Sequence, residues 1–221
     1  MKLSVVNTSG DAVREIDVDD AVFGVEPNLG VVHQALLAQQ ANRRRGTAST
    51  HRRSDHNGAS KKSFRQKGTG RARMGAPSAH TRVGGAVAFG PHPRSYRQRM
   101  PNKMRRLAIR SMLSQRAAEG GLIVLDDPEF EPKTRAMAAL IDALGIDRSA
   151  VLVTAEADQS LKRGIRNLER MDACPADTLN VETIIMHDHL VMTETAVRRA
   201  EELWGGERAA TKRAARDGGD A

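Results

Sequence analysis

Cysteine, aromatic residues and long apolar runs are all scarce in this sequence, and these scarcities limit the classes of protein to which it can belong. Of 221 residues only one is a cysteine, Cys174, and only 3% are aromatic. A single cysteine excludes an internal disulfide and a cysteine-rich zinc site, which fits a reducing compartment. No window approaches the roughly 18 apolar residues of a membrane helix, and the apolar start Met1–Val6 is too short for a signal peptide. We therefore expect a cytoplasmic protein that does not bind membranes.

Acidic residues are almost absent from one long segment of the chain. Between Arg43 and Arg110 lie 19 of the 35 basic residues but only one of the 27 acids, Asp55. The segment has a net charge of +18 and the remainder a net charge of −10, which together give the overall +8. A charge distribution of this kind favours a polyanionic partner, and nucleic acid above all. The sequence therefore predicts an acidic body that carries a strongly basic insert.

Hydrophobic periodicity is lacking between Asn42 and Pro101, where Gly, Ser, Thr, Lys and Arg dominate. Because loops above about 12 to 15 residues are usually functional or disordered, we expect this segment to be mobile without its partner. The expected organisation is a discontinuous globular body (residues 1–42 and 101–205), a basic extended loop (residues 43–100) and a disordered tail (residues 206–221).

The segments on either side of the loop alternate between short apolar runs and helical periodicity, as in an α/β domain. Strand, helix, strand order favours parallel pairing, so the expected fold class is α/β, with a central mostly parallel sheet and flanking helices. The last helix should begin after Thr193 as its N-cap. Strands are expected at residues 3–6, 13–18, 122–125, 151–154 and 179–181, and helices at 29–41, from 103, at 137–144, from 158 and at 194–204.

The densest functional signal is the segment Lys61–Gly75. Its basic side chains can neutralise phosphates, its arginines can stack on bases, and its glycines let the backbone approach RNA without a Cβ. The alternative is a solvated, disordered charge run, which does not explain why acids are excluded over such a length. Half of the six aromatic residues lie in the insert as candidate stacking platforms. Phe64 is the favoured one, because Phe89 and Tyr96 could equally anchor the loop to the body.

Enzymatic and metal-binding alternatives have weaker support. The glycines of the insert follow no strand and form no phosphate-binding loop of the NTPase kind. Asp126 and Asp127 follow an apolar strand, as in some magnesium sites, but favour a simple turn. The run His187–His189 could be a metal clip or a catalytic dyad, or equally a polar turn. Four histidines of the insert have spacings that match no short ligand pair and favour contacts to phosphates or base edges: His51, His56, His80 and His92. We expect no cofactor and no enzymatic activity.

The octet Gln66–Arg73, followed by Gly75, resembles the signature of the bacterial large-subunit ribosomal protein L4 family. The resemblance extends over about residues 1–204. Before the octet, Ser63 and Phe64 stand where the family usually has Pro and Trp or Tyr. Further matching segments are Arg82–Gly85, Pro101–Ala108, Leu122–Val124, Arg166–Leu168 and Leu190–Thr193, the last of which opens the final helix.

This resemblance implies a structural constituent of the large ribosomal subunit whose loop threads into 23S rRNA and aids early subunit assembly. The implied partners are 23S rRNA, neighbouring large-subunit proteins and the nascent peptide, with the protein present as a monomer in the ribosome. The tip of the loop would line the peptide exit tunnel. The implied tip residues are Arg65, Gln66, Lys67, Gly68, Thr69, Gly70 and Arg71.

The rRNA-binding candidates are spread over the loop and the helix after it. These candidates are Arg43, Arg44, Arg45, Arg52, Arg53, Lys61, Lys62, Phe64, Arg65, Lys67, Gly68, Gly70, Arg71, Arg73, Arg82, Arg94, Arg97, Lys103, Arg106 and Arg110.

Two other classes of function remain open. The first is a free RNA-binding regulator, such as a translational repressor or antitermination factor. The second is an RNA-processing enzyme, which would rely on Asp126, Asp127, His187 and His189.

Overall fold

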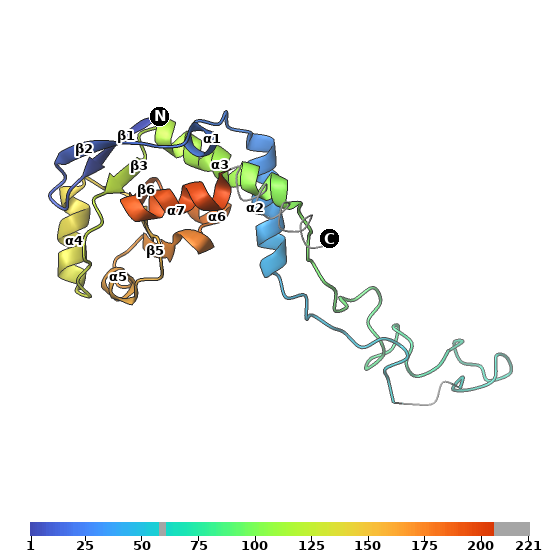
Figure 1. Cartoon of the computed structure of the whole chain (residues 1–221). Coiled ribbons are helices and arrows are strands. Elements are labelled where there is room, and N and C mark those ends of the chain that lie inside the picture. Colours follow the sequence, from blue (N-terminus) through green and yellow to red (C-terminus); the bar gives the residue numbers. More distant parts are fainter. Residues whose placement is uncertain (58–60, 206–221) are drawn as a thin grey trace, which may run out of the picture. The chain divides into compact units, whose positions relative to one another are not determined.

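The computed structural model describes residues 1–57 and 61–205 (Figure 1). The chain divides into two compact units, one that joins Met1–Gln39 to the chain from Arg99 onward and one formed by Gln40–Gln98. The first unit is the body and the second is the loop. The tail expected at residues 206–221 lies outside the described residues.

A single mixed sheet organises the described part of the body. Its strand order is β2-β1-β3-β6-β4-β5. The hairpin of β1 and β2 is antiparallel, while the other neighbours pair in parallel. This confirms the predicted α/β class with a mostly parallel sheet. The strands are β1 (Lys2–Val6), β2 (Ala12–Asp17), β3 (Leu122–Leu125), β4 (Ala150–Thr154), β5 (Met171–Pro175) and β6 (His189–Thr193).

The helices largely follow the predicted periodicity. The Thr193 hydroxyl accepts a hydrogen bond from the Ala196 amide and begins α7, as predicted. Asp158 caps α5 by accepting from the Ser160 amide at 2.7 Å. The helices are α1 (Asp20–Phe23), α2 (Leu29–Arg43), α3 (Asn102–Ala118), α4 (Thr134–Ala143), α5 (Gln159–Ile165), α6 (Val181–Met186) and α7 (Glu194–Trp204), with a short 3₁₀ turn at Ala176–Thr178.

The two faces of the sheet bury separate hydrophobic clusters. One cluster includes side chains of α1, α3, α6 and α7, such as Phe23 and Leu113. The other includes side chains of α4 and α5, such as Leu140 and Leu161. Successive strand residues alternate between the clusters, since side chains of a strand point to opposite faces. Each helix layer is therefore fixed to its own side of the sheet.

The predicted strand at residues 179–181 is wrong. Leu179 and Val181 are buried, but the Asn180 side chain accepts a hydrogen bond from the Thr183 amide at 2.9 Å and caps α6. The apolar residues there belong to a helix start because the Asn180 cap satisfies an otherwise unpaired amide. The strands β5 and β6 were not predicted. Strand β6 includes Leu190–Thr193, the segment that the family resemblance placed at the start of the last helix.

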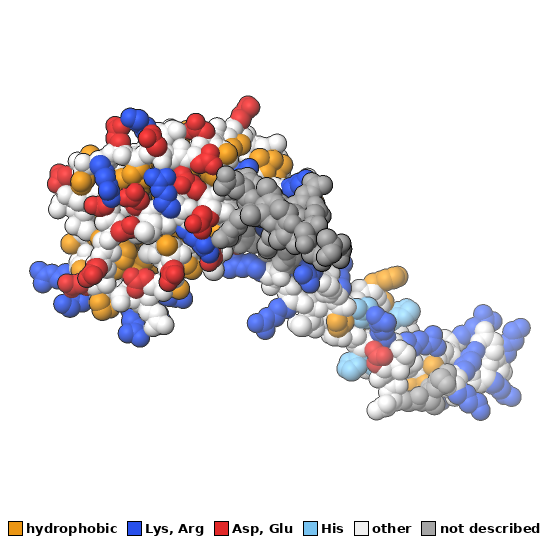
Figure 2. Space-filling view, viewed as in Figure 1, with side chains coloured by type: hydrophobic (Ala, Val, Ile, Leu, Met, Phe, Trp, Pro, Cys, Tyr) orange, Lys and Arg blue, Asp and Glu red, His pale blue; other side chains and the backbone are white. Residues whose placement is uncertain are grey.

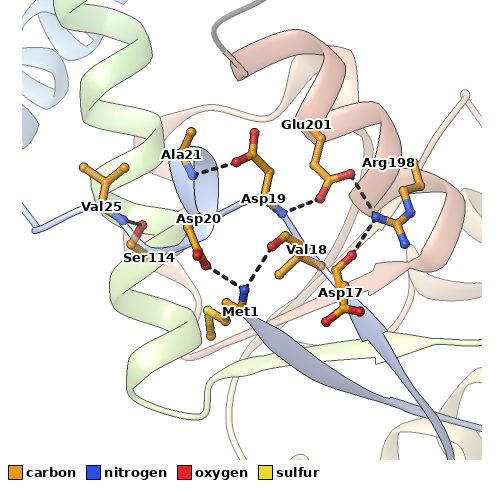
Figure 3. A network of polar contacts seen from close by, with 10 residues as sticks. All are labelled: Met1, Asp17, Val18, Asp19, Asp20, Ala21, Val25, Ser114, Arg198 and Glu201. Carbon is orange, nitrogen blue, oxygen red and sulfur yellow. Dashed lines mark hydrogen bonds and ion pairs between the residues drawn. The ribbon is translucent and has the colours of Figure 1, made fainter.

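A polar network joins the first residues of the body to α3 and α7 (Figure 3). The Asp19 amide donates to Glu201 at 2.8 Å, and Arg198 donates to the Asp17 carbonyl at 2.8 Å. The buried Ser114 hydroxyl accepts from the Val25 amide at 3.0 Å. These contacts fix the segment that leads into α2, from which the loop departs.

Candidate nucleic-acid interface

The loop presents basic side chains to solvent over most of its described length. Figure 2 shows Lys and Arg side chains gathered on the loop, whereas acidic and basic side chains are mixed on the body. The one acid of the loop, Asp55, accepts hydrogen bonds from the Arg52 amide at 2.8 Å and the Ser54 hydroxyl. The Arg52 amide is the main cause that lowers the pKa of this carboxyl, so it stays ionised and locally engaged. The exposed surface of the loop is thus predominantly cationic.

The outgoing and returning limbs of the loop lie side by side without forming a helix or strand anywhere in the described residues after Arg43 and before Arg99. The Gln98 amide donates to the Asn42 side chain at 2.7 Å, and the Arg94 amide donates to the Gly46 carbonyl at 3.1 Å. Farther out, the Thr50 amide donates to the Pro91 carbonyl. We call Asn42–Thr47 together with Pro93–Gln98 the neck.

Gly46 is a position where the neck requires glycine. Its φ is +65°, in the left-handed region that glycine tolerates best. A Cβ there would lie 2.0 Å from the Arg94 carbonyl oxygen and 3.0 Å from the Tyr96 ring. The two limbs can approach this closely only because residue 46 has no side chain.

The Tyr96 ring organises two arginines of the neck. The Arg44 guanidinium carbon lies 3.9 Å from the ring centroid and that of Arg94 lies 4.6 Å from it. Both distances are within the range of cation–π attraction. A hydrogen bond from Arg94 is the main cause that lowers the pKa of the Tyr96 hydroxyl, and the positive charges of both arginines lower it further. The ring is half-buried by these contacts.

An open hollow of about 910 Å³ lies in the neck. Within the described part of the chain, its lining contains four arginines and no carboxylate. The shape and charge of the hollow suit an anion. Its lining residues are Asn42, Arg44, Arg45, Gly46, Thr47, Pro93, Arg94, Ser95 and Arg97.

The glycine-rich signature folds back on itself by side-chain hydrogen bonds. Arg65 donates to the Gly68 carbonyl at 2.8 Å, where Gly68 has a φ of +80°. Arg82 donates to the Ser63 hydroxyl at 3.0 Å, so residues 19 apart in sequence are held together. Around Gly70, which also has a positive φ, nothing lies within 4 Å of a Cβ position. The backbone at Gly70 is therefore open to a close partner.

The three aromatic residues of the loop lie in different surroundings. Phe64 is half-buried, and Tyr96 is covered by arginines. Phe89 is fully exposed and has a φ of +51°, which is unusual for a bulky residue. The structure thus leaves the Phe89 ring the most accessible of the three, although sequence reasoning favoured Phe64 for base stacking and left Phe89 and Tyr96 open between stacking and anchoring of the loop.

The helix after the loop offers fewer free cations than its sequence suggested. Lys103 is exposed and Arg106 is half-buried. Arg110 donates to the Trp204 carbonyl, with Nε at 2.6 Å, and burial is the main cause that lowers its pKa. Arg110 therefore ties α3 to the end of α7, a contact that no sequence pattern indicates. Its role in RNA binding stays a prediction.

Three of the residues considered for metal or catalytic sites, Asp126, Asp127 and His187, are engaged in other contacts, whereas the buried Nδ1 of His189 has no hydrogen-bond partner among the described residues. Asp127 accepts hydrogen bonds from the amide and hydroxyl of Thr195, and Asp126 pairs with Arg14 at 2.6 Å. His187 is buried, with Nδ1 2.8 Å from the Thr183 carbonyl oxygen. Among residues 1–57 and 61–205, no three His, Cys, Asp or Glu side chains form a group able to hold a metal ion. In the same residues, no helix combines the length and apolar character needed to cross a membrane.

Comparisons with known proteins agree on one family. The model of the ribosomal protein L4/L1 family matches residues 16–203. The large ribosomal subunit protein uL4 of Heliobacterium modesticaldum is 45% identical over 204 residues, which cover 92% of this chain and 99% of the relative. The uL4 protein of Dehalococcoides mccartyi strain BAV1 is 45% identical over 206 residues, which cover 93% and 98%. The similarity therefore spans both the body and the loop.

Proposed function

This chain belongs to the ribosomal protein L4/L1 family, and from that premise we propose that it is a structural, non-enzymatic constituent of the large ribosomal subunit in the cytoplasm. It binds 23S rRNA chiefly through the basic loop, and the body orients the loop and contacts neighbouring ribosomal proteins. This function accounts for an exposed cationic loop on a body whose side chains are mixed in charge (Figure 2).

The observation that carries the proposal is the distribution of charge along the folded chain. The arginines and lysines of the loop are exposed except for the half-buried Arg82, and the sole acid, Asp55, accepts a hydrogen bond from the Arg52 amide of its own turn. Each phosphate that such a side chain neutralises releases counterions, so affinity is high at low salt and falls steeply as salt rises. The net-negative remainder of the chain is repelled by RNA and is expected to stay at its periphery.

The signature segment is proposed as the tip that reaches the peptide exit tunnel and lies near the nascent peptide. Two features support this placement. Arg65 closes a short turn by donating to the Gly68 carbonyl, and the backbone at Gly70 has open space around it. A compact, glycine-rich turn suits a narrow channel, because little side-chain volume enters it. By folding on rRNA, the loop would also contribute to early assembly of the subunit.

The test is sedimentation of the tagged protein from a cell lysate. A variant in which residues 44–97 are replaced by a short Gly-Ser linker keeps α2 and Met100, which packs against the body core. Lys162→Gln with Arg163→Gln on exposed positions of α5 serves as a control that removes charge from the body. The full chain and the control should enter the large-subunit peak and survive a high-salt wash, whereas the loop variant should stay at the top of the gradient.

A light position for the full chain would contradict the ribosomal role and favour the free RNA-binding regulator. A loop variant that sediments with the large subunit as stably as the full chain would contradict the anchoring role of the loop. Circular dichroism of the loop variant must match that of the full chain in the strand and helix region, so that an unfolded body is not mistaken for lost binding.

A further inference from the structure

The neck differs from the rest of the loop because its cationic groups are held in place before any ligand arrives. Arg44 and Arg94 both contact the Tyr96 ring. The limbs that carry them are joined through Asn42 and Gln98 and through Gly46 and Arg94. By contrast, an arginine on an unpaired segment loses side-chain entropy when it binds, which reduces its net contribution.

The same residues surround the hollow of the neck. Arg44 and Arg94 line it together with Arg45 and Arg97, and these four side chains are exposed. Guanidinium groups present planar pairs of N–H donors that match phosphate oxygens. The amide of Asn42 adds a polar group to the lining, although its side chain is engaged with Gln98. The hollow thus combines fixed positive charge with room for a sugar-phosphate segment.

We propose that the neck is a preformed binding site for the phosphate backbone of rRNA, in which Tyr96 is the positioning residue that holds Arg44 and Arg94 toward the hollow. This inference rests on the proposed function, since it takes rRNA to be the partner of the loop. Tyr96 acts through the arginines and does not itself bind the phosphate. The lowered pKa of the Tyr96 hydroxyl, caused first by the hydrogen bond from Arg94, agrees with this coupling.

The test is filter binding of the full-length protein to transcribed 23S rRNA over a series of KCl concentrations. Tyr96→Ala should weaken binding by about five- to tenfold, because two cation–π contacts that order the arginines are lost. Tyr96→Phe keeps the ring and both cation–π contacts but loses the hydrogen bond from Arg94, so its loss of affinity should be smaller than that of Tyr96→Ala. The pair Arg44→Gln and Arg94→Gln should lower the slope of log affinity against log salt by about one to two.

A double-mutant cycle separates positioning from a general structural effect. In the background of Arg44→Gln and Arg94→Gln, Tyr96→Ala should change affinity by less than about twofold, because the groups that it positions are gone. A loss in that background as large as in wild type would overturn the positioning role. Lys162→Gln with Arg163→Gln on α5 removes the same charge from the body and should leave affinity within about twofold of wild type.

Two further outcomes distinguish failure of the proposed function from failure of the present inference. If the wild-type chain binds rRNA no better than the variant that lacks residues 44–97, the proposed function fails. If wild type binds but Tyr96→Ala binds equally well, only the present inference fails. Inorganic phosphate is the second probe, at constant ionic strength. Competition by phosphate against rRNA that disappears in the variant with Arg44→Gln and Arg94→Gln would support the neck as a site for phosphate groups of the RNA backbone. Phosphate binding that is lost in that variant while rRNA affinity stays at the wild-type value would identify a site for free anions and overturn the assignment to RNA backbone.

Discussion

Replacing Gly46 by alanine should open the neck without unfolding the body. Gly46 has a φ of +65°, and a residue with a Cβ costs about 1 to 2 kcal/mol in this left-handed region. The added Cβ would lie 2.0 Å from the Arg94 carbonyl oxygen, so the limbs must separate. Separation breaks the hydrogen bond from the Arg94 amide to the Gly46 carbonyl, which adds about 0.5 to 1.5 kcal/mol.

Together these effects amount to about 1.5 to 3.5 kcal/mol, or a factor of about 10 to 400 in the opening equilibrium of the neck. Hydrogen exchange measures this equilibrium directly, because an amide exchanges when its local structure opens. The Arg94 amide is the reporter, since its hydrogen bond to Gly46 closes the neck. Its exchange should be faster in Gly46→Ala by that factor, while amides of the central strand β6 should exchange as in wild type.

Tyr96 supplies a second readout because it is the sole tyrosine of the chain. The hydrogen bond from Arg94 lowers the pKa of its hydroxyl, so opening of the neck should raise that pKa toward its ordinary value. An alkaline titration followed by phenolate absorbance reports this one group. The expected result is a higher midpoint in Gly46→Ala than in wild type.

Gly70→Ala is the matched control. Gly70 has the same φ of +65°, but nothing lies within 4 Å of its Cβ position. The variant carries the same backbone cost without a collision, so both the exchange of Arg94 and the titration of Tyr96 should remain as in wild type. The reasoning would be refuted if Gly46→Ala left Arg94 exchange within about threefold of wild type, or if Gly70→Ala accelerated it equally.

Three further predictions concern single side chains. Ser114→Ala leaves the Val25 amide without its acceptor and should cost about 1 to 3 kcal/mol, seen as a lower melting temperature that the exposed Ser49→Ala does not show. Phe89→Gly relieves the positive φ but removes the exposed ring, so rRNA binding should weaken by about 1 to 3 kcal/mol. Phe89→Trp keeps an aromatic ring and should retain wild-type affinity for rRNA. Equal rRNA affinity of Phe89→Gly and wild type would argue against base stacking by Phe89. Burial raises the pKa of the Cys174 thiol from 9.0 to about 11. Because folding raises this pKa, the contribution of the protonated thiol to the free energy of unfolding is present below about pH 9 and is lost as the pH rises toward 11. Denaturant unfolding at both ends of this pH window should show this loss of stability in wild type but not in Cys174→Ala.

Local patterns in the sequence were enough for much of the body. The strands β1, β2, β3 and β4 and the helices α5 and α7 were all predicted, since each has a period or cap within a short window. The prediction of a strand at residues 179–181 was wrong because it also rested on a pattern within a short window. Leu179 and Val181 have the composition of a strand, but the side chain of Asn180 caps a helix there.

The charge of the loop was also determined by the sequence alone, because net charge depends only on composition. The signature Gln66–Arg73 indicated the family in the same way, and the matching family model confirms it. The binding roles of individual loop residues stay predictions. The structure adds that Phe89 presents a bare ring, while Tyr96 is enclosed by arginines.

Only the tertiary structure decided which distant residues meet. It inserted β6 between β3 and β4, joined Arg110 to the Trp204 carbonyl, and brought Arg44 against Tyr96 across the neck. These pairs lie far apart in the chain, and no local period or cap encodes them. They depend on which surfaces pack together once the elements have formed, because burial and hydrogen-bond satisfaction are optimised over the whole fold and not within one segment.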